Sequence, residues 1–90
     1  MTYVSPQMAA LAAALSGDEL ALGEKRCLQW QFSTQVPMGG FFTALWKAIE
    51  IADGENLIRL KLAFPDDVEA YEAYMIGVLV RKWEALGIGI

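Results

Sequence analysis

The segment from Gly39 to Pro65 constrains the fold more than any other part of this chain. It reads GGFFTALWKAIEIADGENLIRLKLAFP, two apolar stretches of helical periodicity joined by Ala-Asp-Gly and ended by proline. The first stretch carries its apolar residues at i, i+3, i+4 and i+7, the spacing of an amphipathic helix: Phe42, Leu45, Trp46 and Ile49. The second predicts an inward stripe of Leu57, Leu60 and Phe64. Together they predict a helical hairpin at the core.

Two further helices are predicted before this hairpin. Ser5 and Pro6 form a favourable helix start, because serine caps the backbone and proline suits the first helical position. That helix ends at Ser16-Gly17. Ser16 and Glu19 are spaced as a capping box, which predicts a second helix starting there and running to about Ser33. Val36-Pro37-Met38-Gly39-Gly40 then breaks the chain, and Gly39-Gly40 is interpreted as a turn or a close-packing element.

Residues 28–36 allow two interpretations. Leu28, Trp30, Phe32, Thr34 and Val36 alternate with polar residues, which is the periodicity of a strand. As a helix, the same segment places Leu28 one turn before Phe32. The best candidate for a second strand is the alternating segment 57–62. A two-stranded sheet is marginal in isolation, so the helical interpretation is favoured and the small sheet stays as the alternative.

The last predicted helix opens at Pro65-Asp66-Asp67 and runs to about Leu86, which makes it the longest. Its second half is apolar on nearly every side, so it must be surrounded by the fold or by another protomer. Residues 87–90 are expected to fray. The predicted fold is therefore all-α, a compact bundle of four to five short helices forming a single domain over residues 1–90. The alternative is an α+β fold with the sheet from 28–36 and 57–62.

Composition and charge limit the partners. With 56% hydrophobic residues in only 90 residues, some apolar surface is expected to face a partner, and a homo-oligomer is expected. The formal charge is −4, and the basic residues are scattered, which argues against direct binding of nucleic acid. A single cysteine fits a reducing compartment. The longest apolar run in the second half, residues 73–80, is far shorter than the ~20 residues that span a bilayer. A cytoplasmic protein without membrane contact is expected.

Catalytic chemistry is poorly represented. The chain has no histidine, so it lacks a Ser-His or Cys-His nucleophile and a histidine-bearing metal site. Cys27 is interpreted as a buried small hydrophobic residue. The acidic residues Asp66, Asp67, Glu69 and Glu72 are interpreted as a solvated helix start rather than a metal site. No enzyme activity, no metal and no cofactor are expected.

The candidate residues for contact with a partner are therefore aromatic and apolar. Trp30 lies between two glutamines and Trp83 lies among charged residues, a setting typical of interface anchors. The apolar girdle of the last helix, Met75, Ile76, Leu79 and Val80, is predicted to mediate self-association, with Tyr74 beside it.

The motifs GGFFTALWKAI, AD and LAFPDDVEAY resemble a group of small helical proteins encoded in tailed bacteriophages and prophages. The shared residues are apolar and capping residues, so the resemblance implies ancestry and fold and carries over no functional residue. Together with the small size, the high apolar content and the lack of catalytic residues, it favours a phage-encoded accessory protein that binds a host protein, for example an inhibitor of a defence system or of a regulator. An oligomeric sponge for a small nucleotide signal and a virion assembly component are the alternatives. For the sponge, Arg59, Lys61, Arg81 and Lys82 are the candidate cations.

Overall fold

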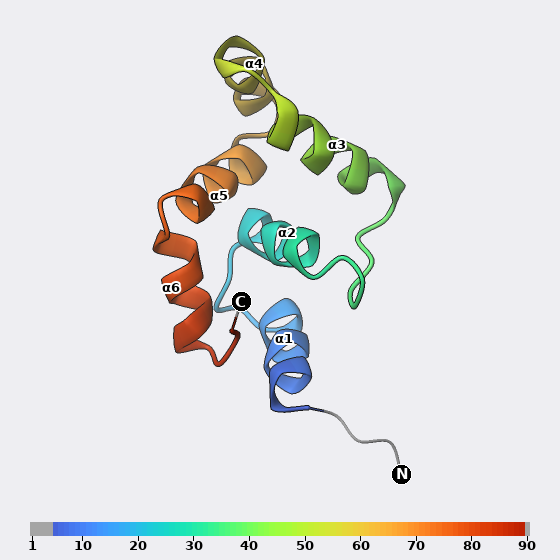
Figure 1. The fold of residues 1–90 in the computed structure, drawn as a ribbon, viewed down its shortest axis with the longest axis vertical. Coiled ribbons are helices and arrows are strands. Elements are labelled where there is room, and N and C mark those ends of the chain that lie inside the picture. Colours follow the sequence, from blue (N-terminus) through green and yellow to red (C-terminus); the bar gives the residue numbers. More distant parts are fainter. Residues whose placement is uncertain (1–4, 90) are drawn as a thin grey trace.

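The computed structural model describes residues 5–89, which form six helices and no strand (Figure 1). The all-helical prediction is confirmed, and the alternative sheet from 28–36 and 57–62 is not observed in this range. In chain order, the helices are α1 (Pro6–Ser16), α2 (Leu22–Gln31), α3 (Gly40–Ile51), α4 (Gly54–Ala63), α5 (Pro65–Met75) and α6 (Val78–Ala85). No helix among these residues is both long enough and apolar enough to cross a membrane.

Helix α5 organises the arrangement, because it packs against α2, α3, α4 and α6. The domain is elongated, with principal extents of 49 × 26 × 21 Å. Figure 1 shows α4 at one end of the long axis and α1 toward the other, with α2 and α5 between them. The two end helices therefore have fewer neighbours than the central pair.

The core is built mainly by the helices other than α4. Its buried apolar side chains come from α1, α2, α3, α5 and α6 and from the segments after α1 and α6: Leu11, Ala14, Leu20, Cys27, Leu28, Leu45, Trp46, Ile49, Val68, Ala70, Leu79, Trp83 and Ile88. Helix α4 has no buried residue, and its inward stripe of Leu57, Leu60 and Phe64 is half-buried. This helix therefore covers one end of the core rather than forming part of it.

Local signals place the starts of α1, α3 and α4 correctly. The Ser5 hydroxyl accepts a hydrogen bond from the Met8 amide at 3.1 Å, as the predicted N-cap requires. The Asp53 carboxylate caps α4 in the same way, through the Asn56 amide at 2.8 Å. Gly39 precedes α3 with φ of +83°, a left-handed conformation that glycine adopts without steric cost.

The predicted start of the second helix is wrong. Helix α2 begins at Leu22, and Glu24 rather than Glu19 turns back to accept a hydrogen bond from the N-cap amide, that of Ala21, at 2.8 Å. Ser16 is still the last residue of α1, and its hydroxyl donates to the carbonyl of Ala12 at 2.9 Å, so it does not start the next helix. The intervening segment can then place Leu20 in the core, where it is 4% exposed.

The end of α2 also differs from both interpretations of residues 28–36. The helix stops at Gln31 rather than about Ser33, and residues 32–35 form a turn. The amide of Val36 donates to the carbonyl of Phe32 at 2.9 Å, which closes this turn. The alternation of apolar residues reflects partial burial of Trp30, Phe32 and Val36 against the core, not a strand.

The predicted single last helix is divided into α5 and α6. The break lies at Ile76-Gly77, where Gly77 adopts φ of +82° and its amide donates to the carbonyl of Tyr74 at 3.0 Å. A left-handed glycine of this kind ends a helix by satisfying its last carbonyls. Residues 5–89 therefore form six helices instead of four to five, and the longest of these is α3 with 12 residues rather than the last one.

The expectation of a frayed end is wrong for residues 87–89, while Ile90 lies outside the described residues. Ile88 is fully buried, and its amide donates to the carbonyl of Trp83 at 3.0 Å. Gly87, with φ of +87°, turns this segment back toward α1, where Ala10 is its neighbour. Figure 1 shows the segment after α6 running back toward α1.

Candidate interaction surface

The candidate residues from the sequence are separated by the fold into buried and exposed sets. Leu79 and Trp83 are 1% and 0% exposed and belong to the core. Trp30, Tyr74 and Val80 are half-buried and pack against that core. Only Met75 and Ile76 stand in solvent. The structure thus keeps two of the seven candidates on an open surface.

The polar groups of the aromatic candidates are mostly engaged within the domain. The Trp30 indole N–H donates to a carboxylate oxygen of Glu50 at 2.6 Å, which joins α2 to α3. The Tyr74 hydroxyl donates to the side-chain oxygen of Gln31 at 3.0 Å, which joins α5 to α2. Within residues 5–89, the Trp83 indole N–H has no hydrogen-bond partner. These aromatic residues stabilise helix contacts.

The break between α5 and α6 leaves an apolar shoulder, which we define as Met75, Ile76 and Val78. Their exposed fractions are 62%, 72% and 48%. Leu79 follows at once but points into the core, so α6 is anchored directly behind the shoulder. Figure 1 places this break on the outer edge of the molecule. Sequence reasoning included Met75 and Ile76 but not Val78, because a continuous helix gives no sign of which residues the break exposes.

A second apolar surface lies on α4. Ile58 and Leu62, one helical turn apart, are 64% and 82% exposed. Glu55 and Arg59 run alongside them and form an ion pair at 2.6 Å. At the start of α4, a hollow of about 500 Å³ opens toward α3 and is lined by Ala48, Ile51, Ala52, Asp53, Asn56, Arg59 and Leu60. None of these α4 residues was singled out from the sequence as a contact candidate for a protein partner.

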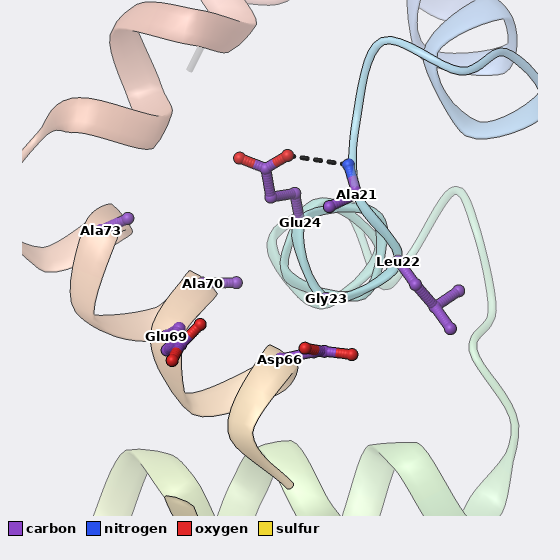
Figure 2. Close-up of a pocket in the computed structure, with 8 residues that line it drawn as sticks. All are labelled: Ala21, Leu22, Gly23, Glu24, Asp66, Glu69, Ala70 and Ala73. Atoms are coloured by element: carbon purple, nitrogen blue, oxygen red, sulfur yellow. Dashed lines mark hydrogen bonds between the residues drawn. The ribbon is translucent and has the colours of Figure 1, made fainter.

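A hollow of about 320 Å³ is lined by the start of α2 and by α5 (Figure 2). Its lining consists of small apolar and acidic residues: Ala21, Leu22, Gly23, Glu24, Asp66, Glu69, Ala70 and Ala73. Figure 2 shows the Glu24 carboxylate turned back to the Ala21 amide, and Lys82 reaches the same carboxylate at 2.9 Å. Of the three acidic residues in the lining, Glu24 therefore already has two partners.

Asp67, the residue after Asp66, belongs to a buried polar cluster that sequence reasoning missed. Asp67 is 2% exposed, and its carboxylate accepts from Arg26 Nη1 at 2.9 Å and from Trp46 Nε1 at 3.1 Å. The Arg26 guanidinium also lies 4.0 Å from the centre of the Phe42 ring. The available signal was the position of Asp67 on the same helix face as Ala70 and Tyr71. The interpretation of the acidic residues as a solvated helix start is therefore wrong for Asp67, which is buried and hydrogen-bonded within the fold.

Two ionisable side chains in the described part of the chain, Cys27 and Lys61, have shifted pKa values. Burial, with a smaller contribution from Glu24, raises the pKa of the Cys27 thiol from 9.0 to about 12, so the thiolate is suppressed. No group of three or more His, Cys, Asp or Glu side chains within residues 5–89 could hold a metal ion. Lys61 is paired with Glu72 at 2.8 Å, an interaction that raises the pKa of Lys61.

Comparison with known proteins adds no assignment. No family model matches the chain, and searches against curated proteins and solved structures give no significant match.

Proposed function

We propose that this chain is a non-enzymatic binding protein that docks onto another protein through the apolar shoulder of Met75, Ile76 and Val78. One observation carries the proposal, namely that three large apolar side chains stand exposed at a single helix break. Removing such side chains from water contributes about 25 cal/mol per Å² of apolar surface. A shoulder of this kind therefore provides a driving force for association.

The setting of the shoulder also supports a docking role. On one side, Tyr74 is tied to α2 through its hydrogen bond with Gln31. On the other, Leu79 is buried in the core. Both flanks are thus fixed before any partner arrives, which lowers the entropic cost of ordering the interface.

The resemblance to phage-encoded proteins supports a protein of the bacterial host as the partner, with a defence component or a regulator as examples. The nucleotide-sponge alternative draws less support from the structure. Three of its four candidate cations are already in ion pairs, because Arg59 contacts Glu55, Lys61 contacts Glu72, and Lys82 contacts Glu24. No contact among the described residues favours a role in virion assembly over the binding of a host protein.

Site-specific photo-crosslinking in bacterial cells tests this proposal. A photoreactive amino acid at position 76 is expected to capture a discrete host protein, whereas the same probe at Lys47, an exposed residue of α3, is not. The captured protein is then purified, and its affinity for the Ile76→Glu variant is expected to fall at least tenfold, since a charge replaces an apolar contact.

Two results would contradict the proposal. One is an identical set of cross-links from positions 76 and 47. The other is a reconstituted complex whose affinity is unchanged by Ile76→Glu while the variant keeps its helical circular dichroism. Capture of phage structural proteins alone, in infected cells, would support the virion alternative instead.

A further inference from the structure

Helix α4 carries an unpartnered outward face with an unusual balance of charge. Its inward side, Leu57, Leu60 and Phe64, packs against the core. The outward side consists of the apolar pair Ile58 and Leu62 and the ion pair Glu55–Arg59, and we call these four residues the α4 stripe. All four side chains are exposed, and the stripe has no net charge although the chain has a formal charge of −4.

We propose that the α4 stripe is the contact surface for a second copy of this chain, which packs its own α4 antiparallel across it. In an isologous contact, both copies use the same residues, and an antiparallel arrangement brings these residues together in reverse order. Ile58 then meets its counterpart near the centre of an apolar seam, and Leu62 of each copy lies toward the ends of that seam. Along one edge of the seam, reversal brings Arg59 of each copy toward Glu55 of the other, so two favourable charge pairs form across the interface.

Charge complementarity favours a second copy over an unrelated partner. A stripe that presents one acid and one base four residues apart is complementary to its own reversed image. A strongly basic or acidic partner would leave one of the two charges opposed by a like charge. The position of the stripe also favours the contact, because α4 lies at one end of the elongated domain (Figure 1).

The contact is independent of the shoulder formed by Met75, Ile76 and Val78. The two surfaces belong to different helices, and no residue is shared between them. The protein can therefore be a dimer through α4 and still present a shoulder on each copy. The failure of one proposal leaves the other standing, since substitutions on one surface do not alter the other.

The oligomeric state of the full chain tests the inference. By sedimentation velocity at micromolar concentrations, the natural sequence is expected to be a dimer and the Leu62→Glu variant a monomer. Ile76→Glu serves as the matched control and is expected to remain dimeric. A monomeric natural sequence would overturn the inference, as would a Leu62→Glu variant that stays dimeric with unchanged circular dichroism.

A charge-exchange experiment separates the contact between copies from the ion pair within one helix. Glu55→Arg alone and Arg59→Glu alone are each expected to raise the dimer Kd by about tenfold, because two attractions become repulsions. An equimolar mixture of the two variants restores opposite charges only across a heterodimer, so association is expected to recover there. A mixture that associates no better than either variant alone would refute the antiparallel arrangement.

Discussion

Arg26 of α2 and Asp67 of α5 form an ion pair at 2.9 Å across the contact between the two central helices. The carboxylate is almost fully buried, whereas the guanidinium is partly exposed and lies over the Phe42 ring. The ion pair links α2 to α5, and the second carboxylate oxygen accepts a hydrogen bond from Trp46 of α3, which holds the carboxylate in place. One buried acid therefore joins three helices.

Replacing Asp67 should be costly. Asp67→Ala leaves the Arg26 guanidinium and the Trp46 indole N–H without their acceptor, and we expect a loss of about 3 kcal/mol in the free energy of unfolding. The exposed neighbour Asp66 provides the matched control, and Asp66→Ala should cost about 0.5 kcal/mol through the helix dipole. Urea titration followed by circular dichroism measures both. Equal losses for the two variants would show that the buried cluster contributes nothing specific.

The close approach of α2 and α5 predicts an unusual effect of alanine. A β-carbon on Gly23 would overlap the carbonyl group of Asp66, so Gly23→Ala should destabilise the domain by about 2 kcal/mol despite the higher helix propensity of alanine. A β-carbon on Gly40, at the start of α3, would meet no other atom within 4 Å. Gly40→Ala should therefore stabilise by about 0.5 kcal/mol. Thermal melts compare the two, and a stabilising Gly23→Ala would contradict the packing described.

The two fully buried tryptophans should respond differently to phenylalanine. Trp46→Phe removes a donor to buried Asp67, whereas the indole N–H of Trp83 has no partner among residues 5–89. Both variants lose indole volume, but only the first leaves an acceptor short of a bond, a penalty of about 1–3 kcal/mol. We expect Trp46→Phe to be the less stable variant in chemical denaturation. The reverse order would indicate that the Trp83 N–H is satisfied in solution.

Cys27 should make stability fall at alkaline pH. Burial raises the pKa of its thiol to about 12 in the folded protein, against 9.0 for an unperturbed thiol. Between these values, the unfolded chain loses the proton while the folded chain keeps it. The free energy of unfolding therefore falls by up to about 1.4 kcal/mol per pH unit above pH 9.

Comparison with Cys27→Ala isolates this effect from the titration of other groups. The difference in the free energy of unfolding between the natural sequence and the variant should shrink as the pH rises from 8 to about 10. In the folded natural sequence, the thiol should also resist a thiol-specific reagent that labels it rapidly in urea. A difference that stays constant with pH would contradict the raised pKa.

How far the sequence predicts this fold depends on whether a signal is local. Ser5, Gly39 and Asp53 cap or precede their helices through residues three or four positions away, so α1, α3 and α4 could be placed. The break between α5 and α6 at Gly77 could not be predicted in this way. One glycine costs a helix only about 1 kcal/mol, and the choice to break depends on whether Leu79 and Trp83 reach the core.

The candidate surfaces show the same limit. The apolar character of residues 74–80 is visible in the sequence, but the side on which each residue falls depends on the break. Arg26 and Asp67 lie 41 positions apart, and nothing near either residue signals the other. Ile58 and Leu62 lie within the predicted hairpin, but the sequence does not reveal that both side chains stay exposed among the described helices.

The buried position of Ile88 ties the stability of α1 to that of the segment after α6. Ile88 and Leu11 belong to one cluster, and Gly87 and Gly89 lie beside α1 at Ala10 and Gln7. Detachment of this segment would expose the side of α1 that it covers. Detachment of α1 would in turn expose Ile88. In native-state hydrogen exchange, the amides of α1 and of residues 86–88 should therefore open together as one cooperative unit, with less protection than the α2–α5 pair.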